Sequence, residues 1–146
     1  MPEVVPNTPN TTIVFSEQRA REFLQKLVNL GPRPSGSVAC DVKAVDLIVE
    51  NIERLKNKID KKHLKRRLDL SIQHPSGCYN LNFLSDFSLC YHNVTNVVAR
   101  LGDPKNNMSK TKALLINCHF DTLPDTPGAT DDAVSSHYFL QLKLKN

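Results

Sequence analysis

The fold prediction starts from residues 113–122, which read Ala-Leu-Leu-Ile-Asn-Cys-His-Phe-Asp-Thr. Residues 113–116 form a short unbroken apolar run, which is typical of a central strand buried on both faces. His119 follows at the carboxyl end of this expected strand, where the ligand sites of open α/β sheets gather. Asp121 lies two residues further on and shares the orientation of His119 if the extended geometry persists. The stretch therefore predicts an α/β sheet with a polar site at the end of its central strand.

A second polar segment follows a loop that is broken by prolines and a glycine. Residues 127–133 read PGATDDA, which places Asp131 at the start of an expected helix. The loop is long enough to fold Asp131 back beside His119. One imidazole and one carboxylate suit zinc, and a carboxylate can bridge two ions that lie about 3.5–4 Å apart. Two simpler interpretations stay open, because an isolated His-x-Asp is common and an acidic pair at a helix start usually caps the helix.

Upstream of this stretch, helical periodicity gives way to alternation. Apolar side chains at helical spacing predict one helix that begins after Ser16 and a second over residues 37–56, with the turn 31–36 between them. The buried stripe of the second helix is expected to comprise Val38, Val42, Val45, Ile48, Val49, Ile52 and Leu55. Residues 1–12 contain three prolines and predict a flexible arm, so that residues 13–146 form one domain.

Strands are expected between this second helix and the polar site. Residues 68–73 alternate apolar and polar side chains, which predicts a half-buried strand followed by a turn at 74–77. Further strands are expected near 81–84 and over 93–101, and a last helix over about 133–144. Helices before and after several strands indicate an α/β layer architecture.

The composition is that of one soluble globular domain, with 146 residues, 40% hydrophobic and 23% charged. No apolar run approaches the roughly 20 residues that span a bilayer, and the first residues lack the basic and apolar regions of a signal peptide. The net charge of +4 arises in residues 54–67, which hold eight basic residues and one acid. The remainder holds eleven basic and fourteen acidic residues, so the chain as a whole lacks a nucleic-acid signature.

The four cysteines and three glycosylation sequons leave the compartment open. Cys40, Cys78, Cys90 and Cys118 include no Cys-x-x-Cys pair, which argues against a thiolate zinc knuckle. Four cysteines permit three pairings, and the sequence does not choose between them and the reduced state. The sequons at Asn10, Asn93 and Asn107 are candidate N-glycosylation sites and permit a lumenal location.

Four segments in the same order resemble the di-zinc aminopeptidases of peptidase family M28, and most closely their endoplasmic reticulum metallopeptidases. They are residues 31–37 (GPRPSGS), 91–98 (YHNVTNVV), 119–122 (HFDT) and 127–133 (PGATDDA). The resemblance implies a three-layer α/β/α zinc-exopeptidase fold with a mixed central sheet. It also implies hydrolysis of N-terminal peptide bonds by a water that two zinc ions activate, a peptide substrate, and residence in the endoplasmic reticulum.

The resemblance also assigns roles to residues of the site. His119 would bind one zinc ion, Asp131 would bridge both ions, and Asp121 would be the catalytic-site carboxylate that orients His119. Asp132 would follow Asp131 through a cis peptide bond, which costs about 3–4 kcal/mol outside proline and persists only where a site enforces it.

One departure from the family pattern is large. The pattern requires a later Glu-Glu pair, another acidic ligand and a final histidine, but the last glutamate here is Glu53, and only fifteen residues follow Asp131. We therefore expect a zinc peptidase domain truncated after the second metal motif and inactive by itself. An uncovered sheet edge would then favour association.

Two other functions stay open at this stage. The chain would be a non-catalytic interaction module if the resemblance survives without the chemistry. Alternatively, residues 54–67 would bind RNA or an anionic membrane surface. We expect no nucleic-acid binding, because no aromatic side chain lies in this stretch to stack on bases.

Overall fold

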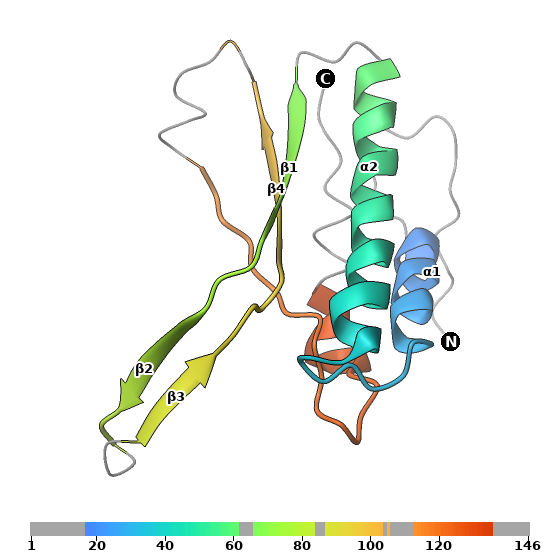
Figure 1. Ribbon diagram of the computed structural model, residues 1–146. Helices are drawn as coiled ribbons and strands as arrows, with labels where there is room; N and C mark the ends of the chain where they lie inside the picture. The colour runs from blue at the N-terminus through green and yellow to red at the C-terminus, as the bar shows by residue number, and fades with distance from the viewer. Residues whose placement is uncertain (1–16, 62–65, 84–86, 104, 106–112, 136–146) are drawn as a thin grey trace.

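A computed structural model gives the structure of the chain and describes residues 17–61, 66–83, 87–103, 105 and 113–135 (Figure 1). The arm predicted for residues 1–12 and most of the helix predicted for 133–144 lie outside the described residues. The elements are α1 (Glu17–Val28), η1 (Ala39–Ala44), α2 (Val45–Lys61), β1 (Arg67–Gln73), β2 (Gly77–Leu81), β3 (Phe87–Tyr91), β4 (Asn96–Gly102) and η2 (Ala129–Ala133). Among them, no helix combines the length and the apolarity that crossing a bilayer requires.

The helical layer confirms the two helices predicted from apolar spacing. Phe23 and Leu27 of α1 and Ile48 and Ile52 of α2 are buried in one hydrophobic cluster, because they recur at helical spacing. The second helical stretch is longer than predicted, since η1 and α2 together run from Ala39 to Lys61.

The first part of the predicted stripe on the second helix is wrong. Val38 is 65% exposed and Val42 is 49% exposed, whereas Cys40 and Ala44 are buried. The reason is that η1 is a π-helix, whose wider turn rotates the buried face away from the positions that α-helical spacing selects.

The strands form one long bent hairpin in two parts. β1 pairs antiparallel with β4, from Arg67 opposite Gly102 to Gln73 opposite Asn96. β2 pairs antiparallel with β3 beyond the bend, and a disulfide joins Cys78 to Cys90 across this outer part. Figure 1 shows β2 and β3 projecting away from the helices.

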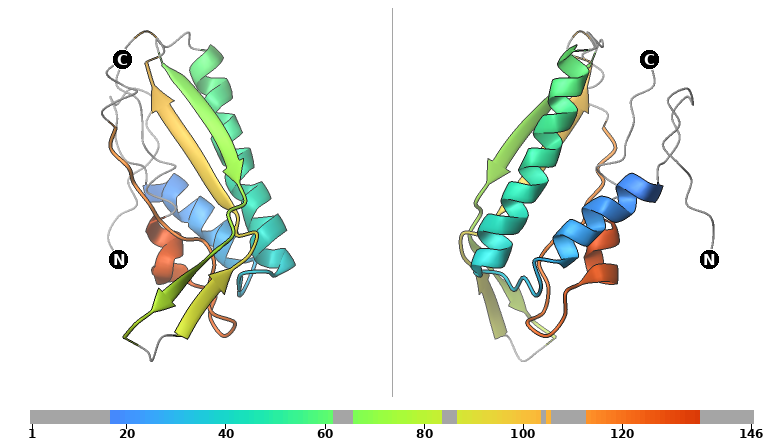
Figure 2. Two further views of the ribbon diagram at one scale, coloured as in Figure 1. Left: turned by 60° about the vertical axis from the view of Figure 1, so that its left-hand side comes forward. Right: turned by 90° about the vertical axis from the view of Figure 1, so that its right-hand side faces the viewer.

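Two layers are visible among the described residues. α2 lies along β1 and β4, and Leu68 of β1 is buried in the same cluster as the helical side chains (Figures 1 and 2). η2 contacts α1, and its Ala133 completes the cluster. The mixed α/β class is thus confirmed, whereas the third layer and the mixed central sheet remain predictions.

The strand predictions met with different outcomes. The strands predicted at 68–73 and 93–101 are confirmed as β1 and β4. The strand near 81–84 is wrong, because β2 begins at Gly77 and ends at Leu81, and Phe83 is 80% exposed. β3 was not predicted, although Phe87, Leu89 and Tyr91 alternate along it, and all five of its residues are exposed.

The predicted central strand at 113–116 is also wrong. These residues adopt no regular secondary structure, and Leu114 and Leu115 are 88% and 85% exposed. An apolar run becomes a buried strand only when neighbouring strands bond its backbone and other layers cover its faces. Within the described part of the chain, β4 pairs with β1 and no strand pairs with this run.

Candidate metal site

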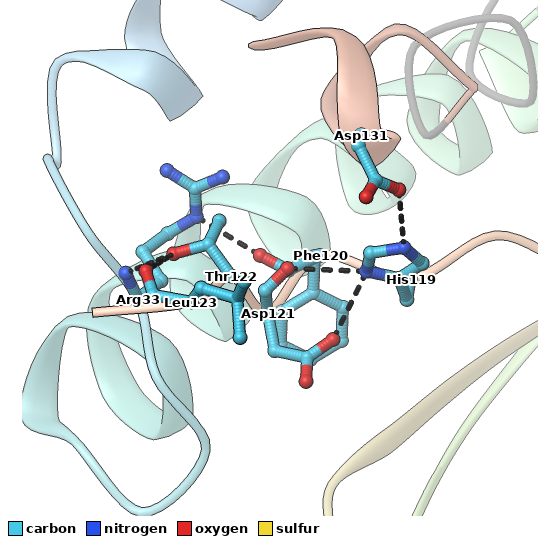
Figure 3. Close-up of polar contacts among 7 residues, drawn as sticks. All are labelled: Arg33, His119, Phe120, Asp121, Thr122, Leu123 and Asp131. Atoms are coloured by element: carbon cyan, nitrogen blue, oxygen red, sulfur yellow. Dashed lines mark hydrogen bonds and ion pairs between the residues drawn. The ribbon is translucent and has the colours of Figure 1, made fainter. Parts of the chain in front are cut away.

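His119 lies between two carboxylates, as Figure 3 shows. Its Nε2 atom is 3.0 Å from Oδ1 of Asp131, and its Nδ1 atom is 3.1 Å from both Oδ1 and the backbone oxygen of Asp121. Carboxylate and carbonyl oxygens only accept hydrogen bonds, so two N–H donors satisfy this arrangement in the protonated imidazole. In the neutral imidazole, one ring nitrogen presents a lone pair to an oxygen, and a cation at that point would relieve the repulsion.

The return of the chain to His119 depends on a glycine. Gly128 has a φ of 56°, in the left-handed region that favours glycine. A Cβ atom at this position would collide with the side chain of Thr122 and would lie 2.8 Å from the backbone oxygen of Asp131. The backbone N–H of Ala133 donates to the oxygen of Gly128 at 3.2 Å and closes the turn. This geometry brings Asp131 back to His119 from twelve residues away.

The backbone at Asp131 departs from the helix that surrounds it. Asp131 has φ −127° and ψ 92° inside η2, and the peptide bond to Asp132 is cis. No side chain caps η2, so the acidic pair does not act as a helix cap. Figure 3 shows the carboxylate of Asp131 directed at the imidazole of His119.

The site is open to solvent and negatively charged. The side chains of His119, Asp121 and Asp131 are 51%, 48% and 89% exposed. Partial burial lowers the pKa of His119. The hydrogen bonds to Asp121 and Asp131 and the charges of both carboxylates raise this pKa by more than burial lowers it, so the net shift is upward. A site of this kind attracts cations and is accessible to them.

Arg33 holds the segment that carries His119, although it is itself fully buried. Its Nε atom donates to the backbone oxygen of Phe120 at 2.9 Å, and its Nη1 atom donates to those of Leu27 and Gly31 at 3.0 and 2.8 Å. Its backbone N–H donates to Oγ1 of Thr122 at 2.7 Å (Figure 3). Sequence reasoning assigned Arg33 no role, because a charged residue in a proline-rich turn carries no signal of burial.

The remaining predicted residues lie apart from this site. Asn93 is exposed and adopts a φ of 54°, and Asn10 and Asn107 lie outside the described residues. In the basic stretch, Arg54 pairs with Glu50 and Arg67 pairs with Asp69. Cys40 is buried, and burial, followed by the charge and hydrogen bond of Asp41, raises its pKa to about 12.

The donor set fits zinc in part. Imidazole nitrogen and carboxylate oxygen are zinc ligands, and a carboxylate that holds the other ring nitrogen is the usual support of a metal-bound histidine. Across the residues that the structure describes, no group of three or more histidine, cysteine, aspartate and glutamate side chains could hold a metal ion. The described site thus brings together one imidazole and two carboxylates.

Comparison with known proteins gives consistent matches. Residues 96–144 match the model of peptidase family M28. A Caenorhabditis elegans protein named as an endoplasmic reticulum metallopeptidase, form 1-A, is 54% identical over 121 residues, which are 83% of this chain and 13% of that protein. Human endoplasmic reticulum metallopeptidase 1 is 34% identical over 128 residues, or 88% of this chain and 14% of that protein. No solved structure gives a significant match.

The matches cover very different shares of this chain and of its relatives. They cover most of this chain, but the chain spans only about one seventh of the length of these relatives. The family match includes both polar segments that the site brings together, HFDT at 119–122 and PGATDDA at 127–133. The chain therefore belongs with the endoplasmic reticulum metallopeptidases of peptidase family M28.

Proposed function

We propose that this chain supplies part of a zinc centre that hydrolyses peptides from their N-terminus. His119 and Asp131 would hold zinc, with Asp131 bridging two ions, and Asp121 would keep the imidazole of His119 oriented through Nδ1. Zinc supplies a Lewis acid that makes a bound water acidic enough to act near neutral pH. The peptide substrate is inferred from the names of the relatives and the family.

One observation carries this proposal. The two segments that resemble metal motifs meet at a single imidazole, with Nε2 of His119 3.0 Å from Asp131 and Nδ1 3.1 Å from Asp121. In a metal-binding histidine, a carboxylate, a backbone oxygen or a water usually holds the second ring nitrogen, and here Asp121 offers both its carboxylate and its backbone oxygen to Nδ1.

The site is incomplete for catalysis in our proposal. No glutamate follows Glu53 among these 146 residues, so they do not include the general base of the family pattern. Loss of a general base costs about 10²–10⁴-fold in rate, and a metal held by two side chains is bound weakly. We expect the chain by itself to bind zinc and to leave peptides intact.

Zinc binding by matched variants tests the proposal. Asp131→Asn keeps the shape of the side chain and removes its charge, and Asp125→Asn makes the same change at an exposed position of the same loop. We expect zinc affinity, measured by competition with a chromogenic chelator, to fall about tenfold or more for Asp131→Asn and to stay unchanged for Asp125→Asn. Equal affinity of the two variants would refute the metal site. Hydrolysis of an aminoacyl amide by the chain alone would refute its incompleteness.

Residence in the lumen of the endoplasmic reticulum is part of the same proposal. The relatives bear that compartment in their names, and the disulfide between Cys78 and Cys90 suits an oxidising lumen. Asn93 is an exposed acceptor for glycosylation in this setting. A chain directed to the lumen should lose apparent mass on glycosidase treatment, and Asn93→Gln should remove one step of that shift. Persistence of every step in Asn93→Gln would exclude this site.

Association is the second function that an observation favours. Leu114 and Leu115 present an apolar surface to solvent, which supports the hypothesis of an interaction module or of self-association. Sedimentation of the chain over a range of concentrations tests it, since a monomer at all concentrations would count against self-association. For RNA binding by the stretch 54–67 no observation speaks, because the stretch contains no aromatic side chain that could stack on bases.

A further inference from the structure

The most unusual group outside the metal-binding pair is the guanidinium of Arg33. Arg33 has no exposed surface, although arginine is seldom buried completely. Three of its hydrogen bonds go to backbone oxygens, of Leu27 at the end of α1, of Gly31 in the turn, and of Phe120 beside the site. The side chain of Arg33 therefore links the end of α1 to a segment that lies 87 residues beyond Arg33 in the sequence.

Arg33 forms hydrogen bonds with the residues directly before and directly after Asp121. Phe120 precedes Asp121, and its carbonyl accepts the Nε hydrogen of Arg33 at 2.9 Å. Thr122 follows Asp121, and its N–H donates to the backbone oxygen of Arg33 at 3.0 Å while its Oγ1 accepts from the Arg33 N–H at 2.7 Å. Three hydrogen bonds thus fix the backbone on either side of the residue that holds Nδ1 of His119 (Figure 3).

The chemistry of these contacts requires arginine. A guanidinium presents five donors in a rigid fork, whereas a lysine ammonium is a single point at the end of a flexible chain. Nη2 of Arg33 is buried and has no hydrogen-bond partner among the described residues, which is a cost that an apolar side chain of similar volume would avoid. Space filling alone therefore does not account for Arg33.

We infer that Arg33 is a positioning residue for the zinc site, acting through Phe120 and Thr122 on the pair formed by Asp121 and His119. This inference rests on the proposed function for its link to zinc. Without the Arg33 side chain, the segment 119–122 loses the hydrogen bond that holds the backbone beside Asp121. The imidazole of His119 then samples several orientations, and a metal must select the productive one.

Two variants separate positioning from general stability. Arg33→Lys keeps the charge and removes the fork, and Thr122→Val keeps the shape and removes the hydroxyl acceptor while leaving the guanidinium in place. The control is Arg21→Lys on the exposed side of α1, where Arg21 pairs with Glu17. We expect zinc affinity to fall about 10- to 100-fold for Arg33→Lys and by a smaller factor for Thr122→Val, as for other groups that support metal ligands. The control should bind as the wild type does.

The readout must be taken on folded protein. Thermal unfolding of each variant sets a temperature at which all are folded, and the affinities are compared there. Variants that unfold more easily but bind zinc as tightly as the wild type would overturn the inference. If Arg33→Lys fails to fold, Thr122→Val decides the outcome by itself.

A second measurement keeps the inference apart from the proposed function. In the metal-free chain, ¹⁵N spectra of the His119 ring at fixed pH report whether its two nitrogens have distinct, ordered environments. If the wild-type chain does not bind zinc, the proposed function is refuted. Even then, averaging of the His119 ring signals in Arg33→Lys would support a positioning role for Arg33. Unchanged ring signals in both Arg33→Lys and Thr122→Val would overturn the inference whatever the zinc affinity.

Discussion

Residues 113–116 and residues 119–122 are neighbours in sequence and differ in a way that their composition does not suggest. The first segment is entirely apolar, yet Leu114 and Leu115 are almost fully exposed. The second segment contains a histidine, an aspartate and a threonine, yet its backbone is held at Phe120 and Thr122 by Arg33. Phe120 also packs against the hydrophobic cluster.

The difference shows that available hydrogen-bond partners decide which segment packs against the body of the protein. The segment 119–122 finds a buried guanidinium and a turn that offer hydrogen bonds, whereas the segment 113–116 finds no strand within the described residues. Apolar side chains favour burial, but a segment is buried only where its backbone N–H and C=O groups also find hydrogen-bond partners. Each prediction below tests this contrast from one side.

The largest contrast is expected in thiol reactivity. Cys40 lies in η1, where burial and Asp41 raise the pKa of its thiol to about 12. The charge of Asp121 in the segment 119–122 also raises this pKa, and the charge of Arg33 lowers it. Because the thiolate is the reactive form, alkylation of Cys40 at pH 8 should be roughly 10³-fold slower than that of Leu115→Cys. The rate at Cys40 should rise about tenfold per pH unit until the pH approaches its pKa. Mass spectrometry of a chain with Cys118→Ser and the disulfide intact measures both rates.

Equal alkylation rates at the two positions would contradict the contrast. They would mean either that the segment 113–116 is protected or that the surroundings of Cys40 open readily. Repeating the measurement in urea separates these explanations. Unfolding should raise both rates strongly if the segment 113–116 is protected, and should change them little if the surroundings of Cys40 already open readily.

The next largest effect is expected when Arg33 is removed. Arg33→Ala takes the donor from three backbone oxygens and leaves a cavity, so the free energy of unfolding should fall by about 3 kcal/mol. Urea denaturation followed by circular dichroism measures this change. Arg54→Ala is the control, because Arg54 is exposed and should contribute less than about 0.5 kcal/mol. A loss at Arg33 no greater than at Arg54 would show that the segment 119–122 does not depend on its partner.

A smaller loss is expected at the turn that returns Asp131 to His119. Gly128→Ala places a Cβ against Thr122 and the backbone oxygen of Asp131 at a φ of 56°, which should cost about 2 kcal/mol of unfolding free energy. Zinc affinity should fall as well, because Asp131 moves. The matched control is Gly36→Ala, since Gly36 also has a positive φ but a Cβ there meets no atom within 4 Å. If both substitutions lower the free energy of unfolding by similar amounts, the positive φ alone accounts for the loss, and the contact with Thr122 does not.

The sequence predicts most of what depends on nearby residues. Helical spacing identifies α1 and α2, alternation identifies β1, and the apolar pattern of 93–101 identifies β4. The meeting of His119 with Asp131 is also predicted, because a loop of known length joins them and its glycine permits the return. Their roles as metal ligands remain predictions that zinc binding must test.

What the sequence does not predict depends on distant partners. The burial of Arg33 depends on a carbonyl 87 residues away, and no local pattern announces that contact. The strand expected at 113–116 depends on neighbours that the segment does not itself encode. β3 pairs with β2 and is joined to it by the disulfide, while all five of its residues are exposed. Local patterns thus identify segments that can form an element, and partners decide whether they do.

The smallest effect is expected where the apolar run meets solvent. Leu115→Ser removes a large side chain that is 85% exposed, so the free energy of unfolding should change by less than about 0.5 kcal/mol. The control is Leu27→Ser, because Leu27 is fully buried and its replacement should cost several kcal/mol. A loss above about 1.5 kcal/mol at Leu115 would mean that the run is packed in solution, either within one chain or between chains. Repeating the urea titration at several protein concentrations distinguishes these two cases, because only packing between chains makes the apparent stability depend on concentration.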